Sequence, residues 1–142
     1  MAERQKGIVL DTNWYVSATI NRKSRRILHH LLTDSKLQIF YSRELLDEYY
    51  RVISRPKFKN QVTLPQVNRF MRLVLPMLSL VKVKSAVQRS RDVKDNFVLS
   101  LAKDAKAKYI VTGDLDLLVL KKYEKTRIVT IAEFLKLMDG SF

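Results

Sequence analysis

Acidic residues are scarce in this sequence, and two of them come just after apolar runs that are typical of β-strands. Only 14 of the 142 residues are Asp or Glu, against 27 Lys and Arg. Asp11 follows the run at residues 7–10, and Asp114 follows the run at 109–112. Open α/β sheets bind their ligands beyond the carboxyl ends of the strands. Either aspartate alone could cap the helix that follows it, but two at one end of a sheet favour a functional site.

A third carboxylate, that of Glu48, is predicted to lie on an apolar helical stripe. Glu48 stands six positions after Ser42, the expected N-cap, and is therefore too far into the helix to serve its terminus. At about 100° per residue it shares one face with Leu45, Tyr49 and Val52. The neighbours expected on the opposite, solvent-facing side are Glu44, Asp47 and Arg51. A carboxylate on an apolar stripe is costly unless it finds a partner or a metal ion; the alternative is a helix-edge Glu that reaches water.

Asp95 has two interpretations that the sequence leaves open. Asp92 could be a helix N-cap with Asp95 three residues later, as in a capping box that has Asp in place of Glu. Asp95 also precedes three apolar residues at helical spacings, namely Val98, Leu99 and Ala102. That spacing places its carboxylate at the top of the buried stripe, facing the carboxyl end of the sheet.

Carboxylates that converge in this way repel one another unless a divalent cation neutralises them. Mg²⁺ and Mn²⁺ prefer oxygen ligands, and such a site can activate water and stabilise the leaving oxygen of a phosphodiester. The sequence offers little for catalysis by a nucleophilic side chain. It has no cysteine, and its two histidines, His29 and His30, are adjacent in a predicted helix and point about 100° apart. These residue types therefore favour metal-dependent hydrolysis.

Short apolar runs alternate with stretches of helical spacing along the chain. The runs typical of strands span residues 7–10, 37–40, 80–83, 109–112 and 127–130. Helical stripes lie within residues 27–32, 45–53, 67–74, 98–105 and 134–138. This alternation predicts an α/β fold with a mostly parallel central sheet of about five strands. Residues 55–61 are expected to form a loop, Pro65 to lie near the start of the next helix and Pro76 to end it. With no repeat and no linker, we expect a single domain over residues 1–142.

The net charge of +13 and the sequence pI near 10.1 indicate a polyanionic partner, with nucleic acid as the leading candidate. The first six residues are polar and show no apolar core of a signal peptide. No apolar run approaches the roughly 20 residues of a membrane span, so no membrane association is expected. The lack of cysteine fits a reducing compartment. We therefore expect a cytoplasmic protein.

Five stretches in order match the motifs of one known family. They are residues 8–13 (Ile-Val-Leu-Asp-Thr-Asn), 42–58 with its trailing Arg-Pro-Lys-Phe, 92–102, 109–118 and 128–134. The chain thus resembles the PIN-domain family, and within it the group described as PIN-family toxin components of toxin–antitoxin systems. Departures are modest: Trp14 and Tyr15 are bulkier than the aliphatic residues expected there, and Val93 replaces a commoner Pro.

The resemblance implies a set of site residues. Asp11, Glu48, Asp95 and Asp114 would be catalytic and, with Asp116 as a fifth carboxylate, would hold one or two Mg²⁺ or Mn²⁺ ions; Asn13 and Thr112 would be polar supports behind them. The resemblance also implies a flavodoxin-like, three-layer α/β/α fold, endonucleolytic cleavage of single-stranded RNA, a homodimer and an antitoxin protein as partner.

Basic residues flank these motifs and are candidate contacts to an RNA backbone. Those expected to bind RNA are Arg22, Lys23, Arg25 and Arg26 after the first motif, and Arg55 and Lys57 after the second. Lys59 belongs to the second group, and Arg89, Arg91 and Lys94 lead into Asp95.

Two other classes of function compete with an endoribonuclease. A non-catalytic RNA-binding or scaffolding PIN domain generally lacks one or more of the acids, and none is missing here. An aspartyl-phosphate enzyme of the haloacid-dehalogenase type needs an Asp two residues after Asp11, where Asn13 stands. A receiver domain needs a Lys after its fifth strand, where this chain has Thr130-Ile-Ala132.

Overall fold

The structure is a computed structural model that describes residues 5–90 and 92–140. Within these residues, six strands form one sheet in the order β3-β2-β1-β4-β6-β5. The strands are β1 (Lys6–Leu10), β2 (Leu37–Tyr41), β3 (Ser79–Leu80), β4 (Tyr109–Val111), β5 (Lys122–Tyr123) and β6 (Thr126–Val129). Neighbouring strands pair in parallel except for the antiparallel β5 and β6. The predicted α/β class with a mostly parallel sheet is confirmed.

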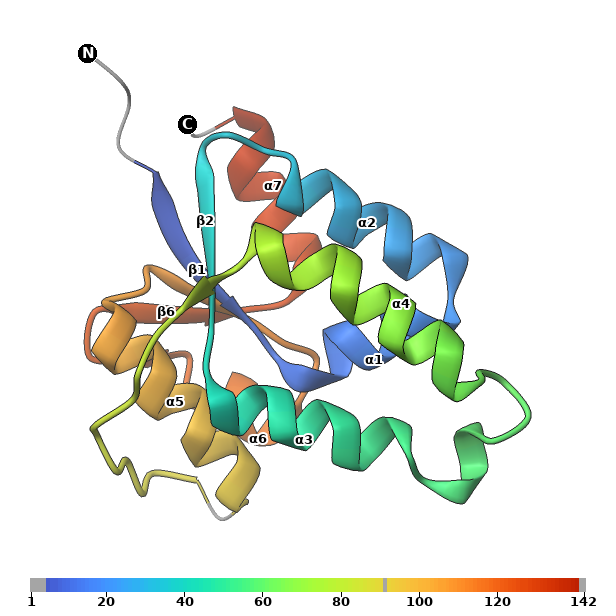
Figure 1. Ribbon diagram of the computed structural model, residues 1–142. Coiled ribbons are helices and arrows are strands. Elements are labelled where there is room, and N and C mark those ends of the chain that lie inside the picture. The colour runs from blue at the N-terminus through green and yellow to red at the C-terminus, as the bar shows by residue number, and fades with distance from the viewer. Residues whose placement is uncertain (1–4, 91, 141–142) are drawn as a thin grey trace.

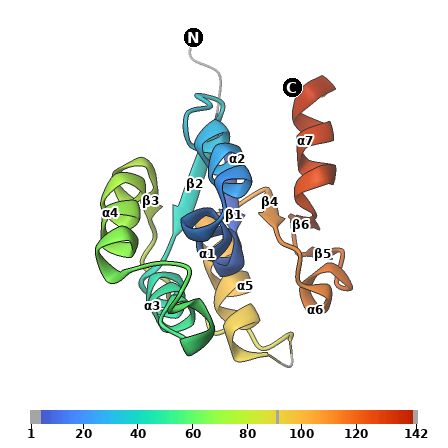
Figure 2. The same ribbon diagram turned by 90° about the vertical axis from the view of Figure 1, so that its right-hand side faces the viewer.

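Helices cover both faces of this sheet. They are α1 (Thr12–Ile20), α2 (Arg22–Leu32), α3 (Arg43–Ile53), α4 (Leu64–Val74), α5 (Val93–Ala105), α6 (Leu115–Leu118) and α7 (Ile131–Gly140). Figure 1 shows α1, α2 and α4 on one side of β1 and β2 and α5 on the other, and in Figure 2 α1 and α2 lie in front of β1. This is the expected three-layer α/β/α arrangement.

Helix boundaries follow the side chains predicted to set them. The Ser42 hydroxyl and the Asp92 carboxylate accept hydrogen bonds from backbone N–H groups in the first turns of α3 and α5, respectively, as N-caps do. Pro65 lies in the first turn of α4, where its missing N–H costs nothing. Helix α4 ends at Val74, and Pro76 lies in the 3₁₀ turn that follows it. The loop predicted at 55–61 contains a second 3₁₀ turn, Pro56–Phe58.

Helix α1 was not predicted from an apolar stripe, because polar residues lie at buried positions of this helix as well as at exposed ones. It packs against α2, α3 and α4, and its buried residues are Thr12, Tyr15, Val16, Ala18 and Thr19. A helix surrounded by other helices needs little polar surface. Asn21, which ends α1, also caps α2 by accepting hydrogen bonds from Lys23 and Ser24, so the chain reverses within one residue.

The edges of the sheet differ from the expectation. The strand predicted at 80–83 is observed as Ser79–Leu80, and its pairing continues only through the Val81 N–H to the Tyr41 carbonyl, at 2.8 Å. An edge strand has one partner, so alternating apolar residues do not by themselves extend it. At the other edge, the two-residue strand β5 adds a sixth strand to the expected five. Its turn to β6 passes through Glu124, which has a φ of 53°.

The centre of the sheet is the most buried part of the molecule. Val9 and Leu10 of β1 and Ile110 and Val111 of β4 have no exposed surface. These two strands are adjacent and parallel, and therefore end on the same side of the molecule, where Asp11 and Thr112 follow them. No helix in residues 5–90 and 92–140 has the length and apolar character needed to cross a bilayer.

Candidate metal centre

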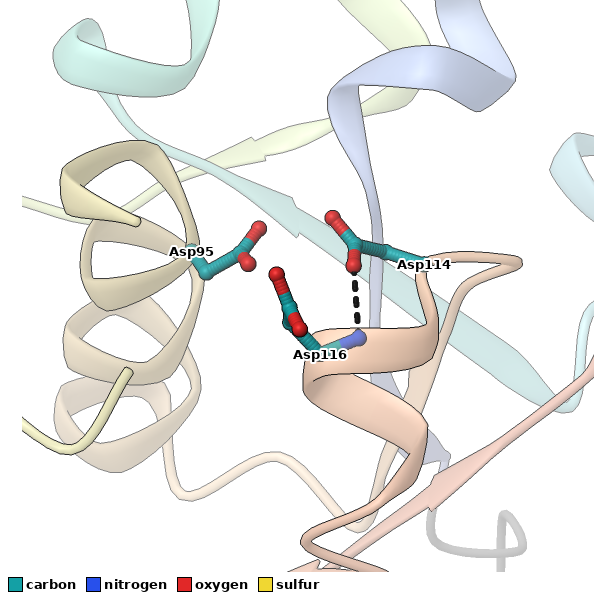
Figure 3. A group of neighbouring side chains, drawn as sticks. All are labelled: Asp95, Asp114 and Asp116. Carbon is teal, nitrogen blue, oxygen red and sulfur yellow. Dashed lines mark hydrogen bonds between the residues drawn. The ribbon is translucent and has the colours of Figure 1, made fainter. Parts of the chain in front are cut away.

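Three aspartates meet beyond the carboxyl ends of β1 and β4 (Figure 3). Asp95 lies in the first turn of α5, Asp114 is the N-cap of α6, and Asp116 lies in the first turn of that helix. One carboxylate oxygen of each lies within 4.8 Å of the corresponding oxygens of the other two. Figure 3 shows the three side chains pointing into the space between α5 and α6. We call these residues the aspartate cluster.

Thr112 ties Asp11 to the segment that carries this cluster. Its hydroxyl donates a hydrogen bond to Oδ2 of Asp11, at 2.7 Å, and accepts one from the backbone N–H of Asp114, at 2.9 Å. The Asp114 carboxylate in turn accepts from the backbone N–H of Asp116, at 2.8 Å. Asp114 is therefore a helix cap as well as a cluster member. Asp11 occupies the N-cap position of α1, but the hydrogen bond that orients its carboxylate comes from Thr112.

Asp95 is buried, with only 1% of its surface exposed, and it is only partly bonded. Its Oδ2 accepts a hydrogen bond from the Ser90 hydroxyl at 3.3 Å. Its Oδ1 is shut off from solvent and accepts no hydrogen bond from any described residue. The capping-box interpretation of Asp95 is wrong, because the Asp92 N–H that a capping box would satisfy donates to Ser90 at 3.2 Å. The Asp95 carboxylate is directed at the cluster instead.

Burial and mutual repulsion both disfavour negative charge in this region. Burial, followed by the negative charge of Asp114, raises the pKa of Asp95 to about 7. Burial is also the main cause that raises the pKa of Asp11, with Asp114 adding to it and the hydrogen bond from Thr112 opposing it. Since Asp11 contributes to the raised pKa of Asp95, the field of Asp11 extends to the cluster. Removing a proton from either residue leaves a buried charge that needs a cation.

Glu48 is buried as predicted, but the guanidinium of Arg51 already pairs with its carboxylate. Arg51 donates from Nε to Oε2 of Glu48 at 2.9 Å and from Nη2 to Oε1 at 2.5 Å. Arg51 is exposed to solvent as expected, but the expectation that it lies away from Glu48 is wrong, because residues three apart on a helix are neighbours. The Glu48 side chain is 10% exposed and that of Arg51 60%. Within the described residues, Glu48 is not part of the closely spaced aspartate group.

Two further acids of α3 were expected to face solvent. Asp47 does so and pairs with Arg43 at 3.4 Å. Glu44 does not, since its Oε2 is shut off from solvent beside the segment that leads into α5. No pattern in the sequence indicates this contact, because the segment between β3 and α5 has no regular structure.

The remaining predicted site residues lie at varied positions. Asn13 is exposed and lines a pocket together with Asp114. Arg22, Lys23 and Arg26 are exposed in the first half of α2. Arg25 donates to the backbone carbonyls of Ala18 and Thr19, at 2.9 and 3.0 Å, and so also closes the end of α1.

The second basic group lies where α3 ends. Arg55 is half-buried there, and the Lys57 ammonium lies 5.0 Å from the centre of the Phe58 ring. Among the residues that lead into α5, Arg89 is exposed, the Lys94 ammonium lies 3.9 Å from Asp92, and Arg91 lies outside the described residues. For all of these basic residues, contact with RNA stays a prediction.

The donor set of the cluster fits a hard divalent cation. Three carboxylates supply oxygen ligands, the type that Mg²⁺ and Mn²⁺ prefer. Asp95 Oδ1, buried and without a donor among the described residues, is an acceptor that a cation would satisfy. No cysteine is available to favour a softer metal.

A family model described as a PIN domain matches residues 7–116. The chain belongs to the PIN-domain family. The matched stretch begins in β1 and ends at Asp116, and therefore includes the aspartate cluster, Asp11 and Glu48. A comparison with curated proteins gives no significant match.

Solved structures share the fold of this PIN domain at low sequence identity. VapBC2 from Rickettsia felis, solved with a promoter DNA fragment, is 18% identical over 86% of this chain and 96% of that chain, with a TM-score of 0.57. VapC20 from Mycobacterium tuberculosis, described as a sarcin-ricin loop cleaving toxin, is 10% identical over 84% and 98%, with a TM-score of 0.57. FitAcB from Neisseria gonorrhoeae is 16% identical over 87% and 96%, with a TM-score of 0.55.

Two residues at the site of this PIN domain were not indicated by the sequence. Ser90 bonds to Asp95 from a segment without regular structure, and no sequence signal marks it. Arg51 could have been found, because the spacing of three residues from Glu48 places an acid and a base side by side on a helix.

Proposed function

We propose that this PIN domain is an endoribonuclease that uses Mg²⁺ or Mn²⁺ to hydrolyse single-stranded RNA. The observation that carries the proposal is the convergence of Asp95, Asp114 and Asp116 in a chain of net charge +13. A strongly basic protein that concentrates negative charge at one point, and leaves one buried oxygen there without a donor among the described residues, has the features of a metal site for a polyanionic substrate.

The aspartates have distinct roles in this proposal. Asp95, Asp114 and Asp116 supply the oxygen ligands, and Asp11, fixed by Thr112, completes the negative field behind them. Glu48 is an outer member of the set, because Arg51 neutralises it before any metal binds. When bound, a divalent cation supplies positive charge that activates water and stabilises the leaving oxygen of a phosphodiester.

The remaining residues act on the substrate rather than on the reaction. Exposed basic side chains in the first half of α2 attract the RNA backbone toward the cluster and hold it there. The products expected from hydrolysis in this family are 5′-phosphate and 3′-hydroxyl ends. That VapC20, which shares the fold, is described as a toxin that cleaves the sarcin-ricin loop supports RNA as the substrate.

We further propose that the protein is the toxin component of a toxin–antitoxin pair and forms a homodimer in the cytoplasm. Support for the pairing comes from the VapBC2 and FitAcB structures that share its fold. A protein that cleaves RNA inside its own cell needs a partner that restrains it. Co-expression with the product of an adjacent reading frame, followed by co-purification, tests the pairing.

The decisive experiment is cleavage of a labelled single-stranded RNA with Mn²⁺ or Mg²⁺. Asp11→Asn and Asp114→Asn should each lower the rate on the order of 100-fold or more, since even groups behind the ligands of a metal site are worth 10- to 100-fold. Asp47→Asn removes one negative charge from an exposed pair on α3, and this matched control should cleave like the wild type.

Circular dichroism of each variant verifies that the fold is retained. Cleavage that persists in excess EDTA, or in folded Asp114→Asn, would contradict the metal mechanism. A wild-type protein that binds varied RNAs without cutting them would instead be a non-catalytic RNA-binding PIN domain.

A further inference from the structure

A pocket of about 350 Å³ opens directly beside the aspartate cluster. It is formed by α1, the start of α2 and the loop between β4 and α6. Its lining residues are Asn13, Trp14, Ser17, Ser24, Gly113 and Asp114. Asp114 belongs both to this pocket and to the cluster. A ligand bound in the pocket would therefore be adjacent to a metal at the cluster. We call this cavity the Trp14 pocket.

Two bulky aromatic residues follow the first motif, and the structure gives them different environments. Tyr15 is 1% exposed and belongs to the core. Trp14 packs against the core with part of its surface but remains half-buried and lines the pocket. It is also the only tryptophan of the chain. Core packing thus explains Tyr15, whereas the indole of Trp14 is available to a ligand.

The lining has the chemistry of a nucleobase site. An indole offers a flat π-face, and any base can stack on such a face. The Asn13 amide offers both a donor and an acceptor, and the hydroxyls of Ser17 and Ser24 can act as either. Polar edges on a flat ring are what distinguish a nucleobase from an apolar ligand. Asn13 and Ser17 are exposed, so their polar groups are free of the core.

The residues around the pocket are suited to the sugar-phosphate part of a nucleotide. Arg22, Lys23 and Arg26 are exposed on α2 close in sequence to Ser24, which lines the pocket. Basic side chains on the helix that contributes Ser24 raise the local concentration of a phosphodiester backbone around this part of the molecule. On the other side, Asp114 leads to the cluster, where the proposed function places the scissile phosphate.

We propose that the Trp14 pocket binds one unpaired base of the RNA, stacked on Trp14, in the nucleotide next to the scissile phosphate. The proposal rests on the proposed function and adds the reason for a single-stranded substrate: a base that is paired and stacked in a duplex cannot enter the pocket. The hydroxyls of Ser17 and Ser24 and the amide of Asn13 then contact the edge of the base.

Tryptophan fluorescence tests this directly, because the signal comes from Trp14 alone. A single-stranded oligoribonucleotide is titrated into the protein in EDTA, which stops cleavage, while anisotropy of a label on the RNA reports binding. We expect quenching of Trp14 that follows the anisotropy curve. A series of RNAs with one abasic nucleotide at successive positions should lose the quenching at one position, next to the cleavage point found with Mn²⁺.

Variants distinguish the loss of base stacking from a loss of protein stability. Trp14→Leu should weaken RNA binding by about 5- to 150-fold, the effect of losing one stacked base, whereas Trp14→Phe keeps an aromatic ring and should lose much less. Tyr123→Leu alters a half-buried aromatic residue of β5 at the edge of the sheet and should bind RNA like the wild type. Thermal denaturation shows whether each variant is folded.

The outcomes distinguish this proposal from the proposed function. RNA that is bound and cleaved with Trp14 fluorescence unchanged, or with undiminished affinity in folded Trp14→Leu, overturns the base pocket and leaves the ribonuclease intact. Quenching that survives at every abasic position also overturns the pocket. A wild-type protein that neither binds nor cleaves RNA overturns both.

Discussion

Two buried carboxylates near one end of the sheet, Glu48 on α3 and Asp95 on α5, have different partners. On α3, Glu48 accepts two hydrogen bonds from Arg51, so its counter-charge belongs to the protein. Between α5 and α6, Asp95, Asp114 and Asp116 lie together, and Asp95 Oδ1 has no donor among the described residues. The first arrangement is complete in the folded chain. The second leaves a buried carboxylate oxygen, Asp95 Oδ1, that a divalent cation would satisfy.

This difference indicates which of the acids are suited to bind a metal ion reversibly. A carboxylate held by a bidentate guanidinium has most of its lone pairs occupied and a fixed orientation. A cluster of like charges stores unfavourable energy that a divalent cation releases on binding. The family motifs include Glu48 and the aspartates as one set of acids, but the structure gives these acids different partners. Three measurements of stability test that difference.

The largest effect should be a pH dependence of stability that the cluster imposes on the metal-free protein. The pKa of Asp95 is raised from an ordinary 3.8 to about 7, so the unfolded chain binds fewer protons than the folded chain between these values. Stability is therefore full below about pH 4, falls as the pH rises toward 7, and is level above that. The raised pKa of Asp11 acts in the same direction. The loss attributable to Asp95 should be about 2 to 4 kcal/mol.

Urea denaturation in EDTA at pH 5 and pH 8 measures this loss. Asp95→Asn, which cannot ionise, should flatten most of the pH dependence and be more stable than the wild type at pH 8. Saturating Mn²⁺ should stabilise the wild type at pH 8 but not this variant. Equal wild-type stability at both pH values would show that ionisation of the cluster does not destabilise the fold.

The second effect on stability concerns the ion pair between Glu48 and Arg51. Arg51→Met leaves the Glu48 carboxylate buried without its cation and should lower the Tm by a few degrees at neutral pH, less than the Asp95 effect because Arg51 is largely exposed to solvent. Glu48→Gln in the same background should recover part of the loss, since it removes the unpaired charge. Mn²⁺ should not rescue Arg51→Met. Rescue by Mn²⁺ would place Glu48 among the metal ligands after all.

The sequence predicted the positions of these acids better than their contacts. Asp11 and Asp114 were located because each follows a buried strand, a feature that depends only on local apolar runs. The capping ambiguity of Asp95 could not be resolved from spacing, since the deciding contact comes from Ser90 in a segment without regular structure. Whether Glu48 would find a cation or a metal depended on the direction of one flexible side chain, that of Arg51.

The central elements of the fold were also predicted more accurately than the peripheral ones. Strands β1, β2, β4 and β6 were predicted within a residue or two because continuous apolar runs mark strands that are buried on both faces. The edges were not, since β3 and β5 are held by a few backbone hydrogen bonds and carry little pattern. Helix α1 was missed for another reason: its buried residues include Thr12 and Thr19, so no continuous apolar stripe marks its buried face.

The smallest effect should come from the other ion pair of α3, between Arg43 and Asp47. Its side chains are 83% and 66% exposed, and their closest atoms are 3.4 Å apart. Water solvates both charges whether or not they pair, so Asp47→Asn should change the free energy of unfolding by no more than about 0.5 kcal/mol and show no response to Mn²⁺. Glu48 stands one residue further along the same helix, with a partner at a similar spacing, and differs mainly in burial. Equal effects of Asp47→Asn and Arg51→Met would mean that burial does not distinguish the two pairs; an effect confined to Arg51→Met ties the difference to the desolvation of the Glu48 carboxylate.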